Sequence, residues 1–296
     1  MKYLKYFKTD VDYQNYFNSG DFVTPNVSYV EDTNIVHYNP YDLIIMTSES
    51  NPEVMKVCYN QGWAASPSEM YASEAAKVTS IGTAFQELGV GSSSGDSGSN
   101  ISFTFSFDEF KYFTGVTSIV DIAFYKSNIV SITIPDSVTS IGKDAFFDCS
   151  NLTSITIPDS VTSISDRAFE SCDSLPVEDN IRYADTYLCR VADRSLSTYT
   201  IKKGTKWIGG SAFNRCSSLT SITIPDSVTS IGGSAFGNCS KLREITCLAI
   251  TAPSITNSTF TGVDSYGDLF YPSGSDYSSW LQNSGFFRWT GQEIQH

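Results

Sequence analysis

The chain has 296 residues, of which 41% are apolar, and it carries a formal net charge of −13. This apolar content is enough to build a core, which excludes a wholly disordered chain. The acidic balance excludes a nucleic-acid-binding role, because phosphate binding depends on clustered lysine and arginine.

Residues 1–45 are crowded with aromatic side chains and are predicted to form an N-terminal attachment module, with a weakly helical start and a hairpin over 22–38. Interfaces are enriched in tyrosine, so these side chains either form an assembly surface, including a homo-oligomer, or pack on the neighbouring domain. The start has no apolar signal core, and no apolar run reaches the roughly 20 residues that span a bilayer, so we expect neither a usual secretory signal nor membrane insertion. The attachment candidates are Tyr3, Tyr6, Phe7, Tyr13, Tyr16, Phe17, Phe22, Tyr29 and Tyr38.

Residues 46–77 are predicted to form a helical N-terminal cap. Asn51-Pro52-Glu53 indicates one helix start, and residues 68–77 a second short helix. The octet VTSIGTAF at 78–85 then begins a repeat that extends to residue 249. Residues 89–100, GVGSSSGDSGSN, predict a flexible loop, and they lack the GKS or GKT ending of a phosphate-binding loop.

The repeat has a period of 23 residues, with clean copies at 131–153, 154–176 and 221–243 and a degenerate copy at 198–220. A fixed period of this length predicts a mainly β solenoid capped at both ends. SITI and VTSI are expected strands, and 143–147 an expected helical or 3₁₀ turn. The predicted inward residues are Ile132, Ile134, Val138, Ile141, Ala145, Phe146, Cys149 and Leu152.

Cysteines recur at one repeat position, which predicts reduced, buried thiols rather than a disulfide framework. The four at this position are Cys149, Cys172, Cys216 and Cys239.

Two segments depart from the repeat. Residues 177–197 predict an inserted β-hairpin with its turn at 192–195, and this insertion makes Arg190 and Arg194 candidate binding residues. Residues 250–296 predict a C-terminal cap, whose aromatic side chains would cover the last coil: Trp280, Phe286, Phe287 and Trp289.

The pattern LxxIxIPxxVxxIxxxAFxxC, at 152–172 and 219–239, resembles the BspA-type (treponemal) leucine-rich repeats of bacterial surface proteins. This resemblance implies a right-handed solenoid with a strand-lined face that serves adhesion or protein binding and not catalysis. The opening segment is similar to N-termini of structural proteins of gut bacteria and their tailed phages.

Outward hydroxyl side chains on the SITI strands should form a regular array at roughly 4.8 Å spacing, suited to a flat polar partner such as a glycan, or simply a solvated face. Its members are Ser131, Thr133, Ser154, Thr156, Thr198, Thr200, Ser221 and Thr223.

The aspartates at the turns and the two histidines are weaker candidates for a site. Asp136, Asp159 and Asp226 share one turn position and could bind a cation, although capping of their own turns is the expected role. His37 and His296 have no ligand or triad partners at suitable spacing. We therefore expect no metal, cofactor or catalytic site.

Two functions remain as hypotheses. The first is a non-enzymatic structural or recognition protein on a virion surface, which attaches to a virion component or a host surface protein. The alternative is a bacterial cell-surface adhesin that binds host protein or glycan.

Overall fold

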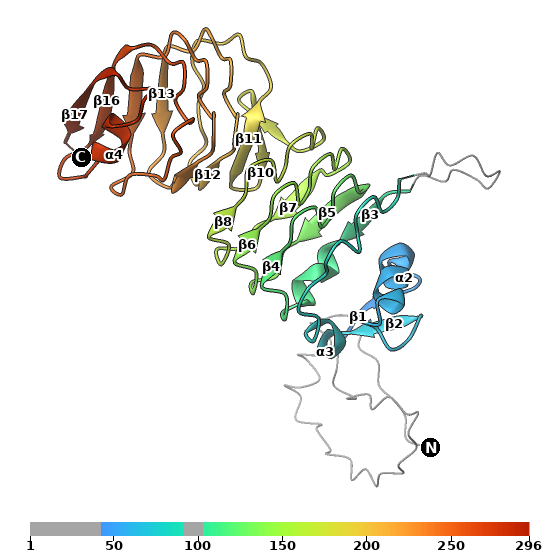
Figure 1. Ribbon diagram of the computed structural model, residues 1–296. Helices are drawn as coiled ribbons and strands as arrows, with labels where there is room; N and C mark the ends of the chain where they lie inside the picture. The colour runs from blue at the N-terminus through green and yellow to red at the C-terminus, as the bar shows by residue number, and fades with distance from the viewer. Residues whose placement is uncertain (1–42, 91–102, 296) are drawn as a thin grey trace, which may run out of the picture.

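Each repeat folds into one coil because its apolar residues recur where they can face inward. The computed structural model describes residues 43–90 and 103–295. They form a mainly β solenoid of about 8 turns with about 23 residues per turn (Figure 1). The predicted inward residues of the coil 131–153 are confirmed, since all of them are at most 2% exposed.

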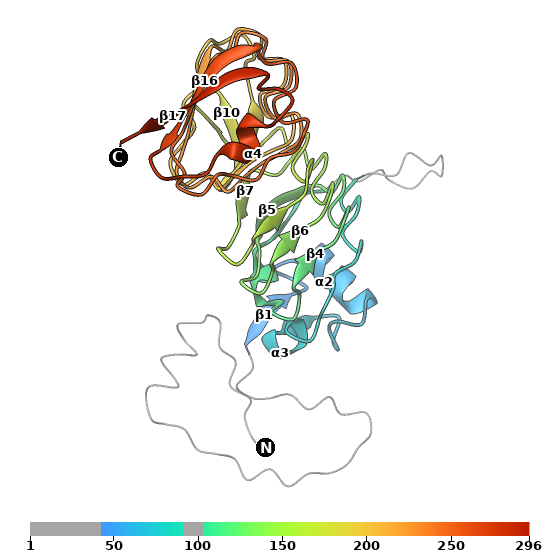
Figure 2. The ribbon, with the colours of Figure 1, turned by 60° about the vertical axis from the view of Figure 1, so that its left-hand side comes forward.

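Two sides of the coils consist of short parallel strands that pair with the same segment of the next coil. In the N-terminal half, the first ladder joins β3 (Phe105–Phe107), β5 (Ile129–Thr133) and β7 (Ser154–Thr156). The second ladder there joins β4 (Ser118–Ile119), β6 (Ser140–Ile141) and β8 (Ser163–Ile164). In the C-terminal half, the first ladder joins β13 (Ser221–Ile224), β15 (Glu244–Cys247), β16 (Tyr266–Pro272) and β17 (Arg288–Ile294). Figure 2 shows these C-terminal coils nearly end-on, one behind another.

The third side of each coil is a run of turns, so the helical turn predicted at 143–147 is wrong. Asp144 and Asp148 adopt left-handed backbone with φ of 54° and 57°, which a right-handed helix cannot contain. This backbone directs alternate N–H groups at the next coil. The Phe146 N–H donates to the Ala168 carbonyl at 2.8 Å, and the Asp148 N–H donates to Glu170 at 2.9 Å. We call this third set of bonds the turn ladder.

A column of aromatic rings runs through the core. Phe124, Phe146 and Phe169 stack with centroid separations of 4.9 and 5.2 Å. In the C-terminal half, Phe213, Phe236 and Phe260 repeat the stack at 5.0 and 5.4 Å. Between these stacks lie Tyr187, tilted on Phe169, and Tyr199, edge-on to Phe213. The buried apolar side chains form two clusters, and the N-terminal one extends to Ala184, Tyr187 and Trp207.

The seven cysteines are free, and six are buried, as the repeat position predicted for four of them. Three thiols of the repeat donate to a carbonyl of the preceding coil, for example Cys149 Sγ to Phe124 at 2.9 Å and Cys172 Sγ to Phe146 at 3.0 Å. Burial also raises the pKa of the Cys58 thiol to about 12. This thiol therefore stays neutral near pH 7 and acts as a small core residue.

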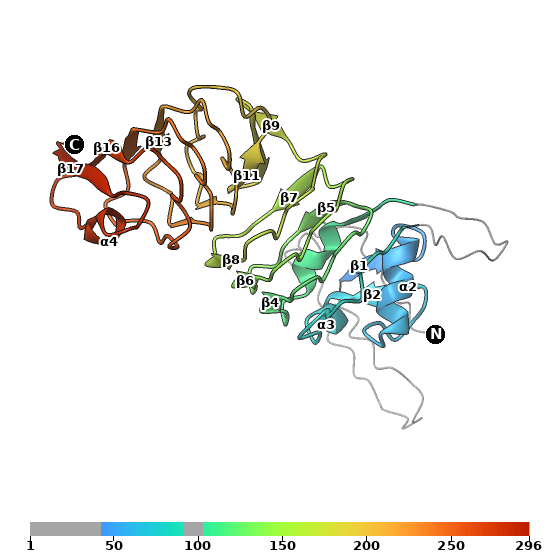
Figure 3. The same cartoon turned by 45° about the horizontal axis from the view of Figure 1, so that its top comes forward.

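At the N-terminal end of the described chain, β1 (Ile44–Thr47) and β2 (Glu69–Tyr71) pair antiparallel beside helix α2 (Pro52–Asn60) (Figure 3). The predicted helix start at Pro52 is confirmed. The second predicted helix is shorter than expected, because α3 covers only Ala72–Ala75 and its first part is strand β2. A 3₁₀ helix, η1 (Asp108–Tyr112), follows β3. The attachment residues, from Tyr3 to Tyr38, and most of the predicted loop 89–100 lie outside the described residues.

The insertion contains three strands, β9 (Val177–Glu178), β10 (Ile181–Ala184) and β11 (Tyr187–Val191). β10 pairs antiparallel with both neighbours, so the hairpin is confirmed. Its predicted turn at 192–195 is wrong, because β10 and β11 are joined at Asp185 and Thr186. β11 then runs parallel to β12 (Trp207–Ile208), which pairs with β14 (Ser230–Ile231).

The C-terminal segment closes the stack with the two long strands β16 and β17 and helix α4 (Ser278–Leu281). Trp280 and Phe286 are buried as expected, whereas Phe287 is 76% exposed and does not cover the last coil. None of the helices in the described part of the chain is long and apolar enough to span a bilayer.

Candidate functional site

The predicted hydroxyl array lies on the first ladder, and its members point outward in register. Ser131 pairs with Ser154 and Thr133 with Thr156, and an isolated bridge joins Thr200 to Thr223. All the hydroxyl residues are exposed except Ser131, Thr133 and Ser221, which are half-buried. Parallel pairing between coils therefore holds the hydroxyl groups in fixed rows.

The array is divided into two patches rather than continuous. Its N-terminal patch comprises Ser131, Thr133, Ser154 and Thr156, and its C-terminal patch comprises Thr198, Thr200, Ser221 and Thr223. The first ladder of the N-terminal half ends at β7, and no pairing joins β7 to the strand segment of the coil 198–220. The row that begins at Ser221 continues into Glu244 and Asp268, so the C-terminal patch borders acidic side chains.

The two patches are separated by what we call the seam, the break in the ladders between the coils 154–176 and 198–220. Strands β9, β10 and β11 occupy it, between the two halves of the solenoid (Figure 3). β8 has no later partner in the second ladder, while β11 begins the ladder of the C-terminal half. The insertion thus belongs by its backbone bonds to the C-terminal half.

Side chains bridge the seam where backbone pairing is missing. The Asp185 carboxylate accepts a hydrogen bond from the Ile157 N–H at 2.8 Å, at the end of β7. Lys206 Nζ lies 2.6 Å from Asp159 Oδ1 and, through this hydrogen bond, lowers the pKa of that carboxyl. Asp159 therefore pairs with a lysine of the next coil, which argues against its proposed cation-binding role with Asp136 and Asp226.

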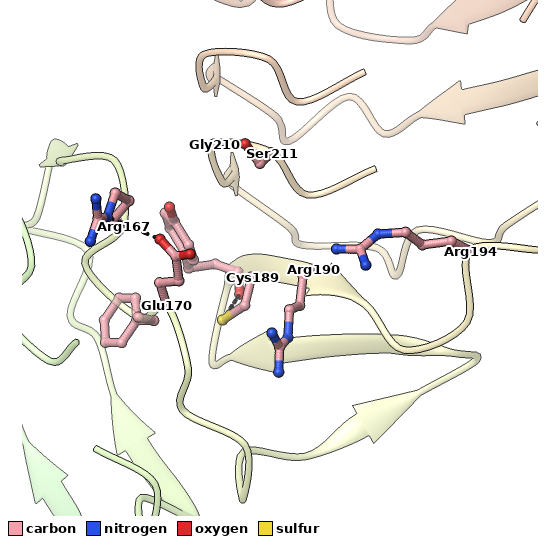
Figure 4. A pocket seen from close by; sticks show the side chains of 9 residues that line it. Arg167, Glu170, Cys189, Arg190, Arg194, Gly210 and Ser211 are labelled. Carbon is pink, nitrogen blue, oxygen red and sulfur yellow. Dashed lines mark hydrogen bonds and ion pairs between the residues drawn. The ribbon is translucent and has the colours of Figure 1, made fainter. Parts of the chain in front are cut away.

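A cavity of about 80 Å³ opens at the seam (Figure 4). Its wall includes Arg190 and Arg194, the two arginines that the sequence singled out. The full lining is Arg167, Phe169, Glu170, Tyr187, Cys189, Arg190, Arg194, Gly210 and Ser211. Sequence reasoning missed Arg167, because it lies in an ordinary repeat position and approaches the insertion only through the solenoid fold.

The arginines of this seam cavity differ in their partners. Arg167 Nε lies 3.1 Å from Asp144 and 3.0 Å from Glu170, and Arg190 is ion-paired with Asp173. Arg194 is exposed and makes no ion pair within residues 43–90 and 103–295. Of the three arginines that line the cavity, it is therefore the one free to bind an external anion.

An aromatic ridge leads to the seam cavity along the turn ladder. Tyr125 and Phe147 stack at 5.4 Å, and the Arg167 guanidinium lies 5.0 Å from the centre of the Phe147 ring. Both rings are half-buried. Aromatic and arginine side chains are enriched in protein interfaces, whereas serine is depleted, so this ridge is as strong a binding candidate as the hydroxyl patches.

The metal site and the two histidines considered from the sequence are the remaining candidates. No group of three histidine, cysteine or acidic side chains is arranged there to hold a metal ion. His37 and His296 lie outside the described residues.

A known protein family matches the repeat region of this chain. A family model described as "BspA type Leucine rich repeat region" matches residues 102–188 and 190–283 in six copies. No curated protein matches the chain.

Several solved structures are similar to this chain. A leucine-rich repeat protein of T. pallidum is 22% identical to this chain. The match covers 59% of this chain and 81% of the T. pallidum chain, with a TM-score of 0.28. A leucine-rich cell surface protein of Faecalibacterium prausnitzii A2-165 is 28% identical. The match covers 64% of this chain and 62% of that protein's chain, with a TM-score of 0.31. The pneumococcal vaccine antigen PcpA is 14% identical. The match covers 64% of this chain and 77% of the PcpA chain, with a TM-score of 0.25. The chain spans less than two thirds of the length of the F. prausnitzii protein.

Proposed function

Because the chain belongs to the BspA-type leucine-rich repeat family, we propose that it is a recognition protein that binds a protein partner at a bacterial cell surface. Proteins of this family are typically non-enzymatic binding proteins. The proposal concerns a surface of the solenoid and requires no cofactor.

The observation that carries the proposal is the fixed geometry of the outward side chains on the first ladder. Thr133, Thr156, Thr200 and Thr223 occupy equivalent positions on strands that are held by inter-coil pairing. Binding to such a preorganised surface costs little conformational entropy. A protein with complementary polar groups is the partner that we favour, and a glycan is the alternative.

The virion hypothesis rests on the aromatic segment, which lies outside the described residues, whereas the cell-surface hypothesis rests on the repeats, which the family model matches. We therefore favour the cell surface. Mass spectrometry of washed cell envelopes should detect the protein, and purified phage particles from the same culture should lack it. Enrichment in the particles instead would reverse this choice.

The strand-face proposal predicts that a fourfold lysine variant loses binding while it stays folded. The variant carries Thr133→Lys, Thr156→Lys, Thr200→Lys and Thr223→Lys. Surface substitutions of this kind change stability by about 0.5 kcal/mol or less each, so the melting temperature should stay close to that of the parent. Binding of the labelled chain to an array of purified host and bacterial surface proteins should fall to background.

The matched control places the same charges on the neighbouring side of the coils, as Thr117→Lys, Thr139→Lys, Thr162→Lys and Thr229→Lys. These threonines are exposed and belong to the second-ladder segment of their repeats. The control variant should retain binding. Equal binding by both variants would rule out the hydroxyl patches as the contact surface, and equal loss would point to net charge rather than position.

A further inference from the structure

The turn ladder has an open edge at the seam. In four other coils, N–H groups at two alternating positions donate to carbonyls of the next coil, and in two of these coils the N–H two residues earlier donates as well. In one coil Ile122, Phe124 and Lys126 bond at 3.0, 2.7 and 2.8 Å, and in another Ser211, Phe213 and Arg215 bond at 2.9, 2.7 and 2.7 Å. The equivalent N–H groups of Arg167, Phe169 and Ser171 have no acceptor in the described part of the chain. Three backbone donors are therefore free in a row.

These donors have the same backbone conformation as their paired equivalents. Arg167 and Ser171 have φ of 66° and 62°, as the repeat requires for donation to a following coil. The strand that follows does not accept them, because β11 is bonded to the other half, where the Val191 N–H donates to Ala212 at 3.0 Å. The alternating backbone points N–H groups of alternate residues the same way, and unpaired backbone N–H groups favour anions and carbonyl oxygens.

The charged side chains around these donors favour the same kind of ligand. Three of the nine residues lining the seam cavity are arginines, although the whole chain has a net charge of −13. The one carboxylate in the lining, Glu170, is already paired with Arg167. Figure 4 shows the Arg194 side chain reaching from the loop after β11 toward Arg190. The cavity therefore combines free backbone donors with an unpaired guanidinium.

We propose that the seam cavity, lined by Arg167, Arg190 and Arg194, binds the carboxylate of an acidic side chain in a protein partner. Its volume of about 80 Å³ is large enough to admit a carboxylate group. A peptide also fits better than a sugar acid, because donors on alternate residues match the carbonyl spacing of an extended chain. The aromatic ridge at Tyr125 and Phe147 would contact an apolar side chain of the same peptide. This inference rests on the proposed function, since it names the chemistry of the partner.

The test uses three probes with the full chain: the peptide acetyl-Glu-Tyr-Glu-Tyr-Glu-amide, its analogue with glutamine in place of glutamate, and a disaccharide that contains glucuronic acid. Binding is followed by fluorescence anisotropy for the peptides and by amide chemical shifts for all three. The acidic peptide should shift the amide signals of Arg167, Phe169 and Ser171, and the glutamine peptide and the disaccharide should not. Arg194→Gln should weaken the acidic peptide about tenfold, the usual effect of one charge-assisted hydrogen bond.

Arg215→Gln is the matched control, because Arg215 is also exposed, has no ion pair in the described chain and lies on the turn ladder of the coil 198–220, outside the lining of the seam cavity. It should leave the affinity unchanged. The inference is overturned if the glutamine peptide binds as well as the acidic one, or if Arg194→Gln leaves the affinity unchanged. It is also overturned if the amide shifts occur away from Arg167, Phe169 and Ser171, if only the sugar acid binds, or if no probe binds at millimolar concentration. The fourfold lysine variant of the hydroxyl patches should still bind the acidic peptide, so failure of the strand-face proposal is distinguishable from failure at the seam.

Discussion

Replacing Phe146 by alanine should lower the free energy of unfolding by about 3–5 kcal/mol, as usual for a fully buried phenylalanine. The ring is completely buried and stacks on Phe124 at 4.9 Å and on Phe169 at 5.2 Å. In a solenoid each coil contacts only its neighbours, so a void in one coil weakens both of its interfaces. Urea unfolding followed by circular dichroism measures the loss.

The adjacent residue provides the control. Phe147 is half-buried on the outer side of the coil, where it contacts Tyr125 and Arg167. Phe147→Ala should therefore cost about 1 kcal/mol, the scale of one exposed aromatic or cation–π contact. Equal losses for the two variants would show that the inner ring column is not what stabilises the stack.

The shape of the transition carries further information about the seam. The buried apolar side chains form two separate clusters, and the N-terminal one, which contains Phe146, extends across the seam to Tyr187 and Trp207. A cavity at Phe146 lies in the N-terminal cluster, so the C-terminal half should remain folded at urea concentrations that unfold the variant's N-terminal half. The single transition of a two-state protein would then separate into two.

The inward residues could be predicted because the same apolar pattern recurs in every copy of the repeat. Ile132 and Ile134 alternate with Ser131 and Thr133, and a shift of one residue would place hydroxyl groups in the core of every coil. The outward direction of the hydroxyl array follows from the same alternation. Its division into two patches could not be predicted, because it depends on which half of the solenoid the insertion pairs with.

The helical turn predicted at 143–147 is wrong for a related reason. Arg167 adopts a left-handed backbone that nothing in its local sequence favours. At Ile122 and Ser211 this conformation comes with a hydrogen bond to a carbonyl of the next coil, such as that of Lys143. A local pattern does not contain that information, so a short helix was the natural but wrong expectation.

The insertion contains a local sequence signal for its first turn. Asp179 and Asn180 both have positive φ, at 48° and 65°, and they form the two-residue connection between β9 and β10. Aspartate and asparagine are the side chains that tolerate this geometry in tight hairpins. The turn between β10 and β11 is formed by Asp185 and Thr186, and Asp185 has a φ of 53°. The Asp-Asn pair could therefore have indicated that the insertion has three strands instead of two.

Trp280→Ala should also cost about 3–5 kcal/mol, but its effect should stay at the C-terminal end. Trp280 is fully buried in the closing segment, and its ring lies 5.3 Å from those of Phe260 and Tyr277. The indole N–H donates to the Pro253 carbonyl at 2.8 Å. Its removal leaves a void and an unpaired buried carbonyl, both of which loosen the last coil.

Amide hydrogen exchange distinguishes this local effect from global destabilisation. Because the stability of a repeat stack is close to a sum of nearest-neighbour terms, protection should fall in β16 and β17 and remain in β5 and β7. Trp280→Phe is the control, since it keeps an aromatic ring on Phe260 and should cost about 1–3 kcal/mol, mainly for the lost hydrogen bond. Equal loss of protection in β5 would mean that the two halves unfold together, in which case side-chain bridges such as Lys206 to Asp159 and Asp185 to Ile157 couple them across the seam as strongly as backbone pairing does elsewhere.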